Sequence, residues 1–154
     1  SAGSQKETFH TMLTETLGEE CDYEVMRTIH DTLNEMLEEH KEEPEPLSLT
    51  KRDVVHILEE TGISNDKIET FEQEFTEAVG EKSNFLASNI AETRKFNIET
   101  PDVVIKVNPN RTDLIETRMI DGKQCIVIAV DDHIQVNGVN VRTLIPKQED
   151  IPAE

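Results

Sequence analysis

The spacing of hydrophobic residues changes near position 94, and this change divides the sequence into two parts. Before it, apolar residues recur every three or four positions, which is the period of an amphipathic helix. After it, apolar and polar residues alternate, as in a β-strand with one buried face. We therefore predict an α+β protein, in which about four to five acidic helices precede an antiparallel β-meander of four to five strands.

Start and stop signals accompany the first two expected helices. Ser4 and Glu7 have the spacing of a capping box, and Gly18 is expected to end the first helix. The second helix is predicted to begin near Asp22. It ends before Pro44-Glu45-Pro46, because proline cannot continue a helix.

Two further helices are predicted with a short connection between them. Thr50 and Asp53 open the third helix, and Gly62 closes it. Ser64 or Asn65 is a suitable cap for the fourth, which keeps its apolar period until Gly80. A fifth, shorter helix is predicted around residues 85–90.

The strand part is divided by turn sequences. Asp121-Gly122 and Asn137-Gly138 tolerate the positive φ angles of tight hairpin turns, and Asn108-Pro109-Asn110 is a further turn. Residues 126–130 are continuously apolar, which is typical of a central strand covered on both faces. Since an open sheet needs one covered face, we expect it to contact the helices.

These patterns predict three regions. Residues 1–93 form the acidic helical region. Residues 94–145 form an antiparallel sheet packed on or beside the helices. Residues 146–154 form an exposed tail.

The charge is large and unevenly distributed. The chain has a formal charge of −18, and residues 1–93 alone carry 23 acidic and 7 basic side chains. This balance argues against nucleic acid and anionic membranes as partners, because both are bound through Lys and Arg. A solvated acidic surface that maintains solubility is favoured over a surface built for a basic partner.

Several features favour a cytoplasmic protein. No apolar run approaches the length of a membrane helix, and no leader sequence is present at the start. Cys21 and Cys125 match no paired-ligand spacing, so two reduced thiols are expected. Because the chain begins Ser1-Ala2-Gly3 without an initiating methionine, we expect a fragment of a longer protein.

No residue is predicted to be catalytic or to bind a cofactor or metal. His30, His40 and His56 lack the spacing that places two metal ligands on one helix face. Cys21 is surrounded by acidic residues that oppose thiolate formation, and Cys125 lies in an apolar strand where cysteine serves as a small hydrophobe. A non-enzymatic role is therefore favoured.

Basic residues gather in the strand part and suggest a binding surface. We select four of them as candidate partner-binding residues: Arg94, Lys95, Arg118 and Arg142. Charge complementarity with the acidic helices of the same chain is the preferred explanation. A partner site along an exposed sheet edge, near residues 139–144, is the alternative.

Three strings carry a resemblance to a known family: LGEECDYEV, TRKFNIETPDVVIKVNP and DLIETRMIDGKQCIVIAVDDHIQVNGVNV. They resemble an uncharacterised family of Firmicutes proteins, chiefly from gut Clostridia, known only as a domain of unknown function. The resemblance spans nearly the whole chain. It implies the C-terminal part of a bacterial cytoplasmic protein at least about twice this length, and it assigns no activity, cofactor or catalytic residue.

Two functions follow as hypotheses. The first is a non-enzymatic accessory or protein-interaction module of a larger protein, with a protein partner and an oligomeric state that the sequence does not indicate. The second is a regulatory or ligand-binding domain of an enzyme whose catalytic part lies upstream. An interaction module should expose an apolar patch or an unpaired strand edge, whereas a ligand-binding domain should contain a closed apolar pocket.

Overall fold

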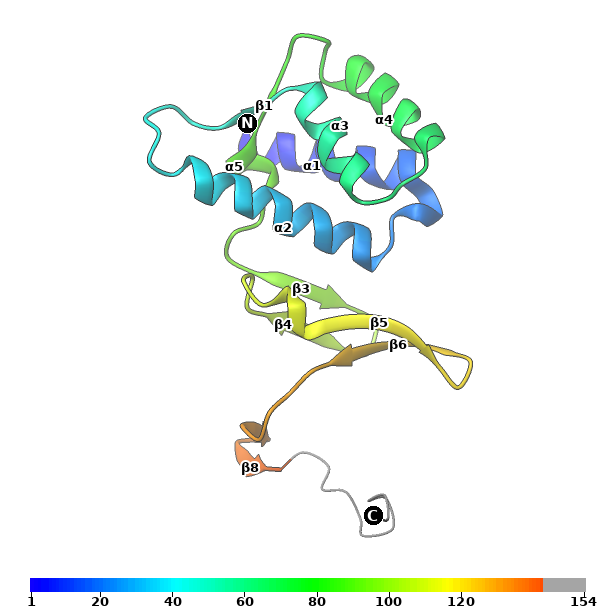
Figure 1. Ribbon diagram of the computed structural model, residues 1–154, viewed down its shortest axis with the longest axis vertical. Coiled ribbons are helices and arrows are strands. Elements are labelled where there is room, and N and C mark those ends of the chain that lie inside the picture. Colours follow the sequence, from blue (N-terminus) through cyan, green and yellow to red (C-terminus); the bar gives the residue numbers. More distant parts are fainter. Residues whose placement is uncertain (143–154) are drawn as a thin grey trace, which may run out of the picture. The chain divides into compact units, whose positions relative to one another are not determined.

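The computed structural model describes residues 1–142 and has its helices in the N-terminal part and most of its strands after them (Figure 1). The predicted α+β class is therefore confirmed. The chain divides into two compact units, of which the first is Ser1–Thr112 and the second begins at Asp113. Each unit is described by itself below.

The first unit contains five α-helices, and the sequence explains most of their ends. Gly18 has a φ of 54° at the end of the first helix, and Asp22 caps the second. Thr50 and Asp53, the predicted start of the third helix, form a capping box. The helices are α1 (Ala2–Leu17), α2 (Tyr23–His40), α3 (Lys51–Glu60), α4 (Asn65–Ala78) and α5 (Ala87–Ile90), with a 3-10 turn η1 at Gly18–Glu20.

The predicted start of the first helix is wrong. Helix α1 begins at Ala2, and the Ser1 hydroxyl accepts a hydrogen bond from the Ser4 backbone N–H. Ser4 is therefore inside the helix rather than at its cap. The Ser4 and Glu7 spacing occurs within the first turns of a helix that a preceding serine already caps.

The hydrophobic core belongs to the helices of the first unit. Phe75 and Phe85 pack edge to face with ring centroids 5.4 Å apart, and Phe9 contacts Phe85 at 5.8 Å. Such pairs add to the stabilisation that aromatic burial provides. The largest fully buried side chains within this core are Phe71, Phe75, Phe85, Leu13, Leu17, Leu49, Leu58 and Val54.

A short strand pair that the sequence did not predict ties the helices together. Strand β1 (Ser48–Leu49) pairs antiparallel with β2 (Phe85–Leu86). Leu49 and Phe85 are opposite one another, and both are buried. Strands of two residues are too short to produce an alternating pattern, so periodicity could not have found them.

A β-hairpin completes the first unit. Strands β3 (Phe96–Glu99) and β4 (Val104–Val107) pair antiparallel, with Phe96 opposite Val107 and Asn97 opposite Lys106. Paired residues share a face, so one face of the hairpin is apolar and the other is polar except for Val104. The unit therefore extends past residue 93, where the period changes, to Thr112.

The second unit contains two hairpins. Strand β5 (Ile115–Ile120), which follows the 3-10 turn η2 (Thr112–Leu114), pairs with β6 (Lys123–Ile128). Strand β7 (Ile134–Val136) pairs with β8 (Val139–Val141). Both turns have positive φ at their central residues, Asp121-Gly122 and Asn137-Gly138, as the sequence predicted.

The expected single sheet is divided into separate hairpins. Each sheet in the described part of the chain has two strands. Ile128 and Val130 are 45% and 59% exposed, so a central strand covered on both faces was a wrong interpretation of residues 126–130. The predicted exposed tail, residues 146–154, lies outside the described residues, and the predicted packing of the second unit on the helices stays a prediction.

Candidate partner-binding groove

One face of α2 anchors the β3–β4 hairpin through polar side chains. His30 Nε2 donates to the Pro109 carbonyl at 3.0 Å, and Asn34 Nδ2 donates to the Glu92 carbonyl at 3.0 Å. The Thr112 hydroxyl donates to the Asp31 carboxylate at 2.8 Å. Since His30, Asp31 and Asn34 share one helix face, α2 holds both the entry and the exit of the hairpin.

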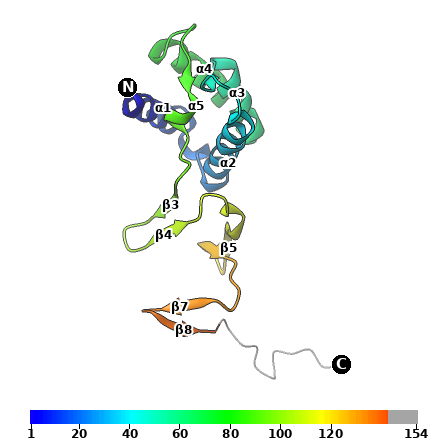
Figure 2. The same cartoon turned by 90° about the vertical axis from the view of Figure 1, so that its left-hand side faces the viewer.

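Aromatic packing supplements these hydrogen bonds. The Phe96 ring lies 4.7 Å from the His30 ring and 6.1 Å from the Tyr23 ring, measured between centroids. The apolar face of the hairpin, which includes Phe96, is therefore directed at α2, and Figure 2 shows the hairpin beside the helices. His30 is therefore a structural anchor. Its Nε2 donates to the Pro109 carbonyl, so this nitrogen has no lone pair with which to bind a metal ion.

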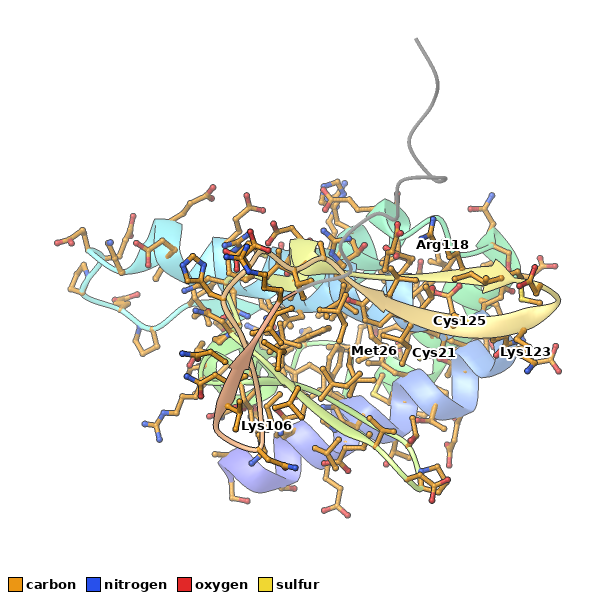
Figure 3. All side chains as sticks on the ribbon, turned by 90° about the horizontal axis from the view of Figure 1, so that it is seen from below. Cys21, Met26, Lys106, Arg118, Lys123 and Cys125 are labelled. Carbon is orange, nitrogen blue, oxygen red and sulfur yellow. The ribbon has the colours of Figure 1, made fainter. Side chains whose placement is uncertain are left out.

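A groove of about 610 Å³ lies between α1, α2 and strand β3. It is open along one side, and its walls are mostly apolar. Figure 3 labels Cys21 and Met26, which both line it. The other residues that form the groove are Lys6, Phe9, His10, Asp22, Tyr23, Ile29, His30, Leu33, Ile90, Glu92 and the five residues 95–99.

Three titratable groups of the groove, His10, Cys21 and Tyr23, have pKa values shifted toward their uncharged forms. Burial, assisted by the nearby Lys6, lowers the pKa of His10. Burial, assisted by the charge of Asp22, raises the pKa of the Cys21 thiol, and burial also raises the pKa of Tyr23. A thiol held protonated is a weak nucleophile, so the environment opposes covalent catalysis by Cys21.

Strand β3 presents its free edge to the groove. Five consecutive residues, 95–99, line the groove, whereas no residue of β4 does. The Thr100 N–H donates to the Val103 carbonyl at 2.8 Å, so these two residues are a hydrogen-bonded pair. Hydrogen-bonded and non-hydrogen-bonded pairs alternate along an antiparallel ladder, so Glu99 and Asn97 belong to non-hydrogen-bonded pairs. The N–H and C=O groups of Asn97 and Glu99 therefore point away from β4. No second strand within residues 1–142 pairs with β3.

The polar face of the same hairpin carries a basic hollow of about 640 Å³. We use this name for the surface formed by Arg94, Lys95 and Lys106 with the neighbouring residues 97 and 107–109. No carboxylate lines it, and these three cations form no ion pair within the described chain. The whole sequence has 33 acidic and 15 basic residues, so the basic hollow has the opposite sign of charge to the chain as a whole.

Two of the four candidate residues from the sequence, Arg94 and Lys95, are brought together in the basic hollow. Lys106, labelled in Figure 3, was missed. The register, with Asn97 opposite Lys106, places it there, and a sequence pattern alone does not supply that register. Arg118 belongs to β5, where its Nε lies 3.6 Å from Glu116, and Arg142 follows β8.

The remaining histidines that were weighed as ligands have local partners. His40 Nε2 donates to the Glu45 carbonyl at 2.7 Å, and His56 lies 3.6 Å from the Glu60 carboxylate. Within residues 1–142, no three His, Cys, Asp or Glu side chains are arranged to hold a metal ion. In the same range, no helix combines the length and the apolar content that crossing a membrane requires.

Comparison with known families gives one match. A family model described as a domain of unknown function, DUF4317, covers residues 1–139. The chain belongs to this family. The DUF4317 match includes the whole groove, the basic hollow and the hairpins of the second unit as far as Val139. No curated protein and no solved structure matches the chain.

Proposed function

We propose that this DUF4317 chain is a non-enzymatic protein-interaction module, the C-terminal accessory part of a larger cytoplasmic protein of Firmicutes bacteria. The resemblance of three sequence strings supports the bacterial setting and the C-terminal position. Free thiols at Cys21 and Cys125 agree with a reducing compartment.

One observation carries the proposal: an apolar groove is walled by the free edge of β3. Unpaired backbone groups on a strand edge form a template for another chain, and proteins that do not use such an edge shorten, charge, twist or cover it. Here the edge adjoins apolar side chains, and the same hairpin carries three cations that form no ion pair within residues 1–142. These are the elements from which peptide-binding sites are built.

Arg94 and Lys95 are the partner-binding residues of the first unit in this proposal. Arg118 and Arg142 would contribute from the second unit, beside apolar side chains that also face solvent. Met119 is 62% exposed and Val139 is 64% exposed. Most of the large apolar side chains that are exposed within residues 1–142 belong to the second unit, and this concentration supports an interaction surface there.

The proposal is tested by affinity capture with the full chain and two charge-reversal variants. The double variant R94E/K95E alters the basic hollow. K51E/R52E makes the same change of charge at the start of α3, where acidic residues suit the helix dipole. We expect the wild type and K51E/R52E to retain one stoichiometric partner from a lysate of the source bacterium, and R94E/K95E to lose it. Absence of any stoichiometric partner, or equal loss in both variants, would contradict the proposal.

A ligand-binding or regulatory domain is the second candidate function. The volume of the groove, about 610 Å³, is within the range of small-molecule sites, and its walls are mostly apolar. Native mass spectrometry of the chain purified from the source bacterium distinguishes this function. A co-purifying small molecule that is lost in a Met26→Glu variant would favour it over a protein partner.

A further inference from the structure

We propose that the groove binds an extended peptide segment of a partner protein, which adds as a third strand along the free edge of β3. The inference rests on the proposed role as an interaction module and defines its binding mode. An added strand would convert the β3–β4 hairpin into a three-stranded sheet, which is more stable than an isolated hairpin.

The backbone supplies the first argument. Asn97 and Glu99 direct their N–H and C=O groups away from β4, so donors and acceptors are repeated along the edge. The four residues of β3 span about 13 Å, which corresponds to four or five residues of a bound strand. A helix satisfies its own backbone groups and could not use this edge.

The side chains of the groove supply the second argument. An added strand continues the two faces of the hairpin, so alternate peptide residues would follow the apolar face of Phe96 and Ile98 into the groove. There they would meet Met26 and Ile29 of α2. The peptide is therefore apolar at every second position.

Charge complementarity fixes the remaining positions. On the polar face, β3 presents Lys95, Asn97 and Glu99 in that order. A strand that runs antiparallel to β3 meets Glu99 first, so its N-terminal position is basic and its C-terminal position is acidic. Arg94 and Lys106 of the basic hollow reinforce the attraction for the acidic end. The partner segment thus has the pattern basic, apolar, polar, apolar, acidic.

A second copy of the chain fits this site less well than a foreign peptide does. Each copy carries a formal charge of −18, so two copies repel one another strongly at low ionic strength. A short peptide with one basic and one acidic residue does not experience that net repulsion.

The experiment is an NMR titration of the ¹⁵N-labelled full chain with the capped peptide Lys-Val-Thr-Val-Glu. We expect the amide signals of Asn97 and Glu99 to shift in a saturable manner. The charge-exchanged peptide Glu-Val-Thr-Val-Lys should bind about fivefold more weakly, since two favourable cross-strand pairs become unfavourable. In the variant K95E the preference for the first peptide should fall or reverse.

Two proline variants identify the edge. Asn97→Pro removes an N–H on the free edge of β3, whereas Lys106→Pro makes the same change directly opposite, on the outer edge of β4. Proline is tolerated where the N–H faces outward. We expect N97P to lose at least tenfold in affinity and K106P to lose about twofold, through its missing charge.

Several results would overturn the strand-addition mode. For the proline variants, these results are full peptide binding by N97P or loss of binding in K106P alone. For the peptides, the result is equal affinity for both in wild type and in K95E. A dimer of the chain that N97P dissociates would also overturn this mode. If N97P unfolds the hairpin, the strand-addition mode is still tested by comparing the affinities of K95E for the two peptides. If N97P captures a natural partner as well as the wild type does, strand addition is rejected but the proposed interaction module is not. If no partner is captured at all, the interaction module itself is contradicted.

Discussion

At the residue scale, exposed polar side chains hold segments of the first unit together. Glu20, in the turn after α1, accepts hydrogen bonds from the Ser64 N–H and hydroxyl, both at 2.9 Å. These bonds lower the pKa of Glu20, because they favour its ionised form. Ser64 is the residue before α4, so one carboxylate links the end of the first helical segment to the beginning of another.

The first prediction concerns the pH dependence of this link. A folded-state pKa below the unfolded value makes the stabilisation complete above about pH 4.5, the ordinary value, and it is lost as the pH falls through the folded-state pKa. We expect Glu20→Gln to lower the melting temperature at pH 7, and the difference from wild type to shrink toward pH 3. Thermal unfolding followed by circular dichroism between these pH values measures it. Glu19→Gln is the control, and an equal effect in both variants would reject the assignment.

At the scale of elements, α2 is the platform on which the β3–β4 hairpin is held. Asn34 Nδ2 donates both to the His30 carbonyl of its own helix, at 2.9 Å, and to the Glu92 carbonyl before the hairpin. A local interaction and a long-range one therefore depend on the same amide group. Removing it leaves a carbonyl of the connection without its donor.

The second prediction is that Asn34→Ala destabilises the first unit by about 1–3 kcal/mol, the cost of leaving a partly buried carbonyl unpaired. Urea unfolding gives the free energy. Hydrogen exchange should accelerate at the amides of β3 and β4 before it does in α4. Glu35→Ala, on the exposed side of the same helix, should change stability by less than about 0.5 kcal/mol. Equal destabilisation by both substitutions would show that α2 itself, and not its link to the hairpin, was affected.

Local signals explain which elements could be predicted from the sequence. The helix start at Thr50 and Asp53, the helix end at Gly18 and the Asp121-Gly122 turn are each specified within four residues, and all three are confirmed. Pairing between hairpins is a long-range property, and turn residues carry no information about it. The antiparallel hairpins were therefore predicted correctly, whereas the single sheet that would join them is not found within residues 1–142.

The groove and the basic hollow could be predicted only in part. Arg94 and Lys95 were selected because basic residues stand out in an acidic chain. Lys106 and the free edge of β3 depend on register and on the absence of a neighbouring strand in the described chain, which periodicity does not report. His30 was weighed as a metal ligand, whereas its role follows from a contact with Pro109, 79 positions away.

At the scale of the whole molecule, the hydrophobic core is confined to part of the chain. The buried apolar cluster extends from Phe9 to Ala91, and the first unit ends at Thr112. Residues 94–112 contribute little to this cluster, yet they are hydrogen-bonded to α2 through Pro109 and Thr112. The end of the helices and the end of the folding unit are therefore different positions.

The last prediction separates these two positions by truncation. A chain that ends at Thr112 should unfold cooperatively with a melting temperature close to that of the first unit in the full chain, because its core and anchors are complete. A chain that ends at residue 93 loses the hydrogen bonds of His30 and Asp31 and the packing of Phe96, which together contribute about 2–4 kcal/mol. Its melting temperature should fall by about 10 °C or more in a unit of this size.

Calorimetry of both truncated chains and the full chain makes this comparison. Equal melting temperatures for the chains that end at 93 and 112 would place the boundary of the folding unit at the change of hydrophobic period. A large loss of stability at 112 would instead mean that the second unit supports the first. Because β3 carries the free edge of the groove, only the boundary at Thr112 keeps the groove and its anchoring helix in one cooperative unit. Partner binding in that case would stabilise the first unit directly, through preferential binding to its folded state.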